Sequence, residues 1–222
     1  MGKQFKRELE KLKKKIFELC AMVEENLKNA LNSIVERNEM LADNVVKEDD
    51  KIDTMEMEVE EECLKILALH QPVAVDLRFI ISALKINNEL ERIGDLAVNV
   101  VERGFQLFKS DPVKVQVDFN DMFEKAMAML NKSLDAFINF DSDLSYEVCK
   151  LDDEVDELHR KMFGIFKTEV KENPSHMDIM LHYLTISRHL ERVADHATNI
   201  AEDVIYMVDG DIIRHGSHGV TT

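Results

Sequence analysis

The chain has 222 residues, 45% of them hydrophobic, and its 44 acidic side chains outnumber its 28 lysines and arginines to give a formal net charge of -16. This balance argues against nucleic acid as a partner, because binding a phosphate backbone requires clustered cations. With 7 Gly, 3 Pro, no Trp and no apolar run long enough for a membrane span or signal peptide, the composition favours a soluble, intracellular, all-helical protein with a substantial core.

Three long helices are predicted for the first half of the chain. Apolar residues recur at helical spacing over 5–34, which indicates a first amphipathic helix. A second helix is expected from about 38–41 to 69, where His70-Gln71-Pro72 ends it because proline cannot continue the helical hydrogen-bond ladder. A third is expected over about 75–108. Since it is apolar nearly all round, it should be central to the bundle.

Both the second and the third predicted helices carry carboxylates on an otherwise apolar face. The motif Leu90-Glu91-Arg92-Ile93-Gly94-Asp95 places Glu91 and Asp95 four residues apart, so both project from one side of the helix about one turn apart. Asp49 and Asp53 form a similar pair on the second helix. Carboxylates therefore occupy positions where a helical bundle normally has leucine.

The acidic pairs recur in the second half of the chain. Asp49 and Asp53 return as Asp152 and Asp156 at an offset of 103 residues. The motif of the third helix returns at an offset of 100 as Leu190-Glu191-Arg192-Val193-Ala194-Asp195. An internal repeat of this length indicates that one supersecondary unit occurs twice.

This repeat defines the expected fold. The residues lost between the two offsets belong in a turn around Pro174. The chain is therefore expected to be an all-α protein of six long helices in two tandem three-helix bundles, approximately 1–110 and 113–210. The boundary is expected at Ser110-Asp111-Pro112, and a short polar tail at 211–222.

Hairpin geometry predicts that the acidic pairs within each half meet. In two antiparallel helices of equal rise, residues at equal distances from the turn stand side by side. Counted from turns near Val73 and Pro174, the pairs on the second and third helices of each half lie at closely matching distances. Two clusters of four carboxylates are predicted: Asp49, Asp53, Glu91 and Asp95 in the first half, and Asp152, Asp156, Glu191 and Asp195 in the second.

Three interpretations of these clusters remain open at this point. Burying four unneutralised carboxylates would exceed a typical stability of about 5 to 15 kcal/mol, so something must neutralise or hydrate them. They could line a solvated groove or pair with arginines, bridge metal ions between helices, or act in acid-base catalysis, for which nothing designates a substrate pocket. Oxygen ligands suit hard cations such as Mg, Mn, Ca or Fe. The arginines available are Arg78, Arg92, Arg188 and Arg192.

Two further residues could add a ligand to each cluster, namely Glu56 and His159, which occupy equivalent positions on the same helix face. Asp156-x-x-His159 resembles the acid-x-x-His element of di-iron bundles, which keeps a carboxylate-bridged di-metal (ferritin-like) oxidase or storage protein as an alternative function. However, Glu-x-x-His does not occur in the sequence, and a lone histidine on such a face is more often a hydrogen-bonded core residue. An enzyme is therefore not expected.

Several motifs together resemble the PhoU family of phosphate-signalling regulators, namely Gln71-Pro72-Val73-Ala74, Asp76-Leu77-Arg78, Leu84-Lys85 and Leu90-Glu91-Arg92-Ile93-Gly94-Asp95. The resemblance covers nearly the whole chain, including both halves of the repeat. It implies two three-helix bundles whose Glu/Asp-x-x-x-Asp pairs can hold multinuclear iron clusters or other metals, such as Zn, Mn, Mg or Ni. Carried over by position, the eight carboxylates above would be the ligands.

The same resemblance implies a cytoplasmic adaptor, usually a homodimer, that negatively regulates phosphate uptake and the phosphate-starvation (Pho regulon) response. Its implied partners are the ATP-binding subunit of the high-affinity phosphate ABC transporter and a sensor histidine kinase. Nucleic acid is not implied, and the membrane is reached only through these partners. No Gly-rich phosphate cradle occurs in the sequence, so direct binding of phosphate is not predicted.

Overall fold

The computed structural model describes residues 3–111 and 119–213, and this part of the chain forms six α-helices and one short 3-10 helix. The prediction of an all-α protein with six helices in two repeats is confirmed. The predicted start of the second bundle at 113 and most of the predicted tail lie outside the described residues. The helices are α1 (Lys3–Glu36), α2 (Glu39–His70), α3 (Ala74–Phe108), α4 (Phe119–Asn139), α5 (Ser142–Glu172), the 3-10 helix η1 (Pro174–His176) and α6 (Met177–Asp209).

The first turn of each half is built in the same way. Asn38 caps α2 by accepting a hydrogen bond from the backbone N–H of Leu41 at 3.1 Å. Asp141 caps α5 by accepting one from the backbone N–H of Leu144 at 3.0 Å. A side-chain acceptor at this position satisfies one of the unpaired N–H groups in the first turn of a helix. The offset between Asn38 and Asp141 is again 103 residues, so the repeat found in the acidic pairs extends to the turns.

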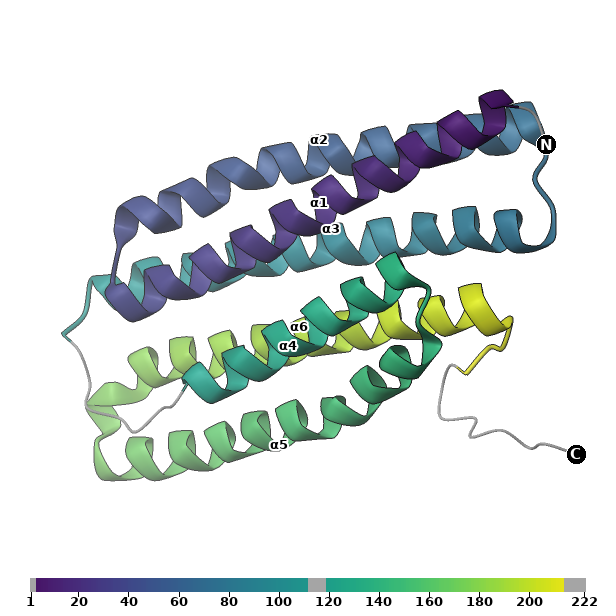
Figure 1. Cartoon of the computed structure of the whole chain (residues 1–222). Coiled ribbons are helices and arrows are strands. Elements are labelled where there is room, and N and C mark those ends of the chain that lie inside the picture. The colour runs from purple at the N-terminus through teal and green to yellow at the C-terminus, as the bar shows by residue number, and fades with distance from the viewer. Residues whose placement is uncertain (1–2, 112–118, 214–222) are drawn as a thin grey trace, which may run out of the picture.

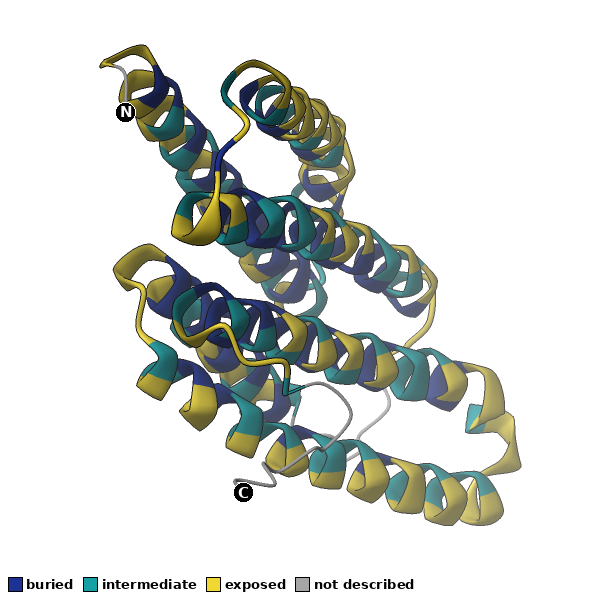
Figure 2. Cartoon of the chain, turned by 90° about the vertical axis from the view of Figure 1, so that its right-hand side faces the viewer, coloured by how far each residue is buried: buried dark blue, intermediate teal, exposed yellow. Residues whose placement is uncertain are grey.

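Helices α3 and α6 lie antiparallel at the centre of the molecule (Figure 1). Helix α3 packs against α1 and α2 of its own half and against α6, and α6 packs against α4, α5 and α3. Buried positions face inward between the helices, and exposed positions line the outside (Figure 2). The predicted central place of the third helix is confirmed, and α6 holds the equivalent place in the second half. Among the described helices, none combines the length and apolarity needed to cross a membrane.

The contact between α3 and α6 includes polar side-chain pairs as well as apolar side chains. Lys85 Nζ lies 3.0 Å from Oδ1 of Asp203, whose side chain is only 5% exposed. His196 Nδ1 lies 2.6 Å from Glu89 Oε2, to which Asn199 Nδ2 also donates. Burial opposes ionisation of Glu89, but the hydrogen bonds from His196 and Asn199 outweigh it and lower the pKa of Glu89. Because buried polar groups require hydrogen-bond partners, these pairs favour one register of the two halves.

Two glycines let α3 approach its neighbours closely. A Cβ atom on Gly104 would overlap Ile34 Cδ1 of α1. A Cβ atom on Gly94 would lie 3.1 Å from Asp49 Oδ1 of α2. Gly164 of α5 differs, since an added Cβ would meet open space. The glycines of α3 are therefore explained by packing, whereas Gly164 is not.

Replacing these glycines by alanine should separate helix propensity from packing. Gly164→Ala is expected to raise the free energy of unfolding by about 1 kcal/mol, because alanine is the better helix former and nothing obstructs its side chain. Gly104→Ala gains the same helix propensity, but its new methyl group must displace Ile34. The free energy of unfolding of Gly104→Ala should therefore be about 1–3 kcal/mol lower than that of Gly164→Ala. Urea denaturation measures both variants. Equal gains would contradict the close contact between α1 and α3.

Candidate functional site

The four predicted carboxylates of the first half come together between α2 and α3. Asp49 is half-buried, whereas Asp53 and Asp95 are exposed at the edge of the cluster. Burial raises the pKa of Asp49 to about 6, and the other three carboxylates add to this shift. Burial, followed by the charges of Asp95 and Asp53, also raises the pKa of Glu91. The cluster is therefore a group of mutually repelling charges that opens to solvent on one side.

The second half forms the equivalent cluster between α5 and α6. Burial, followed by the charges of Asp195 and Asp156, raises the pKa of Asp152 to about 6. Burial, followed by the charges of Glu191 and Asp156, raises the pKa of Asp195. The structure thus brings together both predicted groups of four, as the hairpin geometry required. Their role as metal ligands stays a prediction.

The two clusters differ in how their most buried oxygen is satisfied. Asp152 Oδ1 accepts a hydrogen bond from Thr198 Oγ1 at 3.4 Å. The first half has Val98 at the position of Thr198, and valine has no donor. Asp49 Oδ1 is buried and has no hydrogen-bond partner in the described part of the chain. Because an unpaired buried acceptor is costly, this oxygen suits a cation or a water molecule.

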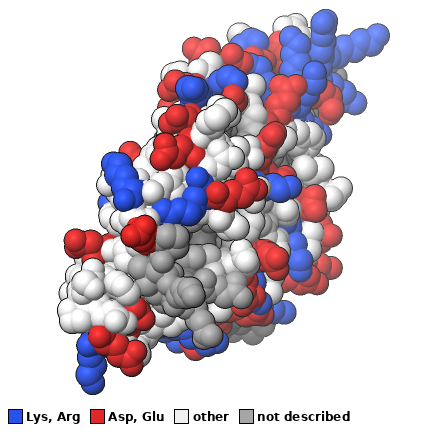
Figure 3. All heavy atoms as spheres, turned by 90° about the vertical axis from the view of Figure 1, so that its left-hand side faces the viewer, with Lys and Arg blue, Asp and Glu red and all other residues white. Residues whose placement is uncertain are grey.

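Neutralisation of the clusters by arginine is not supported. Within 3–111 and 119–213, none of the eight carboxylates forms an ion pair with lysine or arginine. Arg78 instead donates from Nε to the carbonyl oxygen of Met207 at 3.2 Å. At the end of the molecule that faces the viewer in Figure 3, acidic and basic side chains are interspersed. The charges of Arg92 and Arg192 oppose the raised pKa of Glu91 and Asp195 but do not cancel it, so neighbouring arginines offset the negative charge of the clusters only in part.

Glu56 and His159 are each held by a side chain of the neighbouring helix. Glu56 Oε1 accepts a hydrogen bond from Asn87 Nδ2 of α3 at 2.8 Å. His159 Nδ1 lies 2.8 Å from Ser187 Oγ of α6. These are equivalent contacts in the two halves. They favour the interpretation of both residues as hydrogen-bonded packing residues over the interpretation as additional ligands.

The donor atoms of the clusters fit a hard cation, but the side chains are not arranged around one point. Across the described ranges, no three His, Cys, Asp or Glu side chains converge closely enough to hold a metal ion. Like charges repel, so carboxylates without a counterion splay apart, and the exposed Asp53 and Asp95 can change rotamer. A cation that keeps several waters needs only one or two carboxylates. The chemistry of the oxygen donors therefore suits a hard cation, and binding one with more than two of these carboxylates requires some of the side chains to move.

Some polar contacts were not predicted from the sequence. The pair Glu89–His196 joins the two halves, and Thr198 supports only the second cluster. A signal was present in the repeat, since the first half has Leu96 and Val98 at the positions of His196 and Thr198. Positions that are apolar in one half and polar in the other therefore indicate polar contacts that the helical periodicity of the sequence does not predict.

A chain of two three-helix repeats with one carboxylate cluster in each defines a class of duplicated helical-bundle proteins. The PhoU domain matches residues 16–104 and 119–204, and so extends over both halves. The PhoU homolog 1 of Thermotoga maritima, a phosphate-specific transport system accessory protein, is 36% identical over 97% of this chain and 94% of its own length. The PhoU homolog of Aquifex aeolicus is 39% identical over 94% of this chain and 95% of its own.

Solved structures show the same likeness. The crystal structure of PhoU from Pseudomonas aeruginosa superimposes with a TM-score of 0.90 at 37% identity, covering 93% of this chain and 100% of that one. The phosphate transport system regulatory protein PhoU from Streptococcus pneumoniae gives 0.83 at 26% identity, covering 94% and 98%. The chain belongs to the PhoU family. This is a family of regulatory accessory proteins and not of enzymes, which confirms the expectation that the chain is not an enzyme.

The raised pKa values of Asp49 and Asp152 predict how the stability of the metal-free protein depends on pH. Between about pH 4 and pH 6 the folded state keeps protons that the unfolded state has lost, so the contribution of these groups to stability falls as pH rises and is level above pH 6. Asp49→Asn and Asp152→Asn should each raise the free energy of unfolding at pH 7 by about 1 kcal/mol, a value reduced because both groups are half-exposed.

Chemical denaturation of chelator-treated protein at pH 4, 5.5 and 7 measures this difference. The gain over wild type should be small at pH 4 and largest at pH 7. Asp43→Asn is the matched control, because Asp43 is exposed on the same helix and outside the cluster. A gain that is the same at every pH, or the same for Asp43→Asn, would contradict the charge repulsion described for the clusters.

Proposed function

We propose that this chain is a cytoplasmic metal-binding adaptor that negatively regulates phosphate uptake and the phosphate-starvation response. Membership of the PhoU family, and the naming of its relatives as accessory or regulatory proteins of phosphate transport, support the regulatory part. One observation carries the metal part: each repeat has four neighbouring carboxylates at equivalent positions, and no lysine or arginine of the described residues forms an ion pair with them.

The metal would be iron or another hard cation held by oxygen ligands. A bound cation would supply the positive charge that each cluster lacks, and would thereby tie α2 to α3 and α5 to α6. Because such a ligand binds the folded state only, it would add stability by mass action. The proposed ligands are Asp49, Asp53, Glu91 and Asp95 in one cluster, and Asp152, Asp156, Glu191 and Asp195 in the other.

The proposed partners are the ATP-binding subunit of the phosphate ABC transporter and a sensor histidine kinase, bound by a homodimer of this chain. An adaptor shifts a partner's activity only if it binds one state of that partner more tightly than the other. In this proposal the chain reaches the membrane through these two proteins.

The alternative, a ferritin-like oxidase or storage protein, is less well supported. The sequence motif that favoured it was Asp156-x-x-His159, and His159 is hydrogen-bonded to Ser187. Membership of a family of regulatory accessory proteins also favours the adaptor.

The metal part is tested by elemental analysis of untagged protein purified after anaerobic loading with iron or manganese. A variant with Asp49, Asp53 and Asp95 changed to Asn and Glu91 changed to Gln is expected to keep roughly half of the metal, because one of two equivalent clusters is removed. Wild type should also gain about 2–3 kcal/mol in free energy of unfolding for each occupied cluster when metal is present at about 100 times its Kd.

The matched control is the same set of changes at the equivalent residues of the second half, Asp152, Asp156, Glu191 and Asp195. It should also retain roughly half of the metal, and the two variants combined should retain none. Absence of metal from wild type after loading, or equal melting temperatures with and without metal, would rule out a metal function for the clusters.

The adaptor part is tested in bacterial cells that lack their own PhoU protein. Expression of the chain is expected to restore repression of a phosphate-starvation reporter at high phosphate, because the adaptor would again couple transporter and kinase. Pull-down of the two partner proteins with each cluster variant is the accompanying measurement. Repression that persists when the metal is lost would make the metal structural. A folded wild-type chain that neither binds a partner nor represses would overturn the adaptor proposal.

A further inference from the structure

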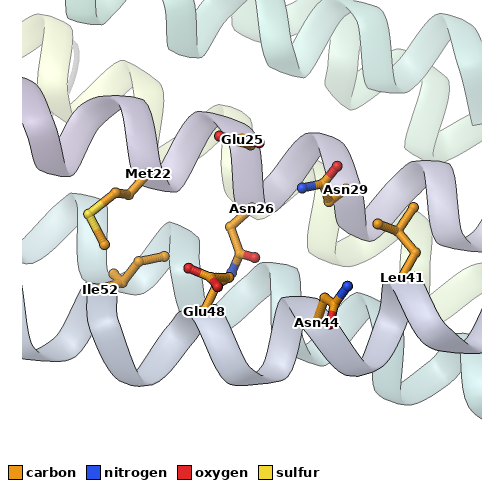
Figure 4. A pocket seen from close by; sticks show the side chains of 8 residues that line it. All are labelled: Met22, Glu25, Asn26, Asn29, Leu41, Asn44, Glu48 and Ile52. Atoms are coloured by element: carbon orange, nitrogen blue, oxygen red, sulfur yellow. The ribbon is translucent and has the colours of Figure 1, made fainter.

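A pocket of about 420 Å³ lies between α1 and α2, outside the carboxylate clusters (Figure 4). Its polar lining consists of the amides of Asn26, Asn29 and Asn44 and the carboxylates of Glu25 and Glu48, and three apolar side chains complete it. None of the eight cluster carboxylates and no lysine or arginine lines it. The pocket therefore offers oxygen acceptors and negative charge to a ligand.

Asn26 presents a buried acceptor at the middle of this pocket. The residue is only 3% exposed, and its Nδ2 donates to the carbonyl oxygen of Val45 at 3.2 Å. Its Oδ1 is buried and has no hydrogen-bond partner in the described part of the chain. Figure 4 shows the amide between the two helices, with Glu48 beside it. An unpaired buried carbonyl oxygen is costly, so a donor from a ligand would be favoured there.

The second half shows which group fits this groove. At the repeat offset of 103 residues, Asn29 and Asn44 correspond to Lys132 and Glu147. Lys132 Nζ lies 3.2 Å from Glu147 Oε2, so an ammonium group bridges α4 and α5 there. Asn26 corresponds to Met129, which is fully buried and needs no donor. Where the second half uses its own lysine, the first half has amides.

Two carboxylates of the first-half pocket have no counterpart in the second half. Glu25 and Glu48 correspond to Ala128 and Leu151, so the half that contains the lysine lacks these two acids. Lys51 donates to both oxygens of Glu48, at 2.6 and 2.7 Å, but it is exposed and does not line the pocket. The first-half pocket thus has two carboxylates and no lysine in its lining, whereas the equivalent positions of the second half have one carboxylate, Glu147, which is paired with Lys132.

We propose that the pocket between α1 and α2 binds a primary alkylammonium group, supplied either by a free amine or by a lysine side chain of another protein. An ammonium group has three donors, which match the unpaired Asn26 Oδ1 and the carboxylates of Glu25 and Glu48. The alkyl chain would lie against the apolar part of the lining, as the stems of lysines do on protein surfaces. This site is separate from the clusters and does not depend on the proposed function.

The test is a titration of the full-length protein with n-butylammonium in physiological salt, followed by the side-chain amide NMR signals of Asn26, Asn29 and Asn44. Saturable binding with shifts at these three amides is expected. The uncharged isostere 1-butanol should bind about tenfold or more weakly, because hydrogen bonds to a charged group are the stronger ones. Equal binding of the alcohol would overturn the proposal.

Two variants transfer features of the second half to the pocket. The double change Asn29→Lys with Asn44→Glu leaves the net charge unaltered and supplies an internal ammonium group, so it should weaken butylammonium binding about tenfold or more. Asn26→Met, which copies Met129, removes the acceptor and should weaken binding as well. Circular dichroism and melting temperature establish that each variant is folded. Wild-type affinity in both folded variants would overturn the proposal.

Two further arms identify the place and the source of the amine. Butylammonium binding should persist with saturating Mg²⁺, whereas loss of the amide shifts under Mg²⁺ would place binding at the carboxylate clusters and overturn the proposal. N-acetyl-lysine methylamide is titrated in parallel. Tighter binding of this compound than of butylammonium supports a lysine side chain as the source, and tighter binding of butylammonium supports a free amine.

Discussion

The antiparallel contact between α3 and α6 is the constraint on which the rest of this structure depends. Each of these helices packs against the other two helices of its half and against its counterpart, so most of its residues are buried or partly buried. The pairs Lys85–Asp203 and Glu89–His196 fix how the two halves are aligned. Helices α2 and α5 are consequently left on the outside, and the interfaces at which the acidic pairs meet remain open to solvent.

The carboxylate clusters lower the stability of the bundles locally, and the bundles tolerate this because of the arrangement of the helices. Their charges are only half-buried, so solvent screens part of the repulsion that full burial would impose. The apolar residues above and below each cluster continue the core along α2, α3, α5 and α6. The apolar residues at the two ends of each helix face thus stabilise the bundle. Under the proposed function, the carboxylates in the middle of that face are available to bind a cation.

The two halves share a fold but differ in the hydrogen bonds and charges at equivalent positions. Thr198 gives Asp152 a hydrogen bond that Val98 cannot give Asp49. Lys132 bridges α4 and α5, whereas Asn29 leaves the equivalent groove between α1 and α2 without a cation. The first difference removes a hydrogen-bond donor, and the second removes a positive charge. The first half is therefore the one that contains unsatisfied buried acceptors at both of these places.

The sequence by itself determined the helices, the repeat and the membership of the two carboxylate clusters. Periodicity and Pro72 set the helix ends, and within a hairpin the number of residues from the turn fixes which side chains stand opposite one another. Only the tertiary structure decided the pairing of Glu89 with His196, which are 107 residues apart, and the unpaired state of Asn26 Oδ1. The physical reason is that helical periodicity says which face of a helix is buried, but contacts between helices not joined by a short turn depend on their relative position and rotation, which packing alone sets.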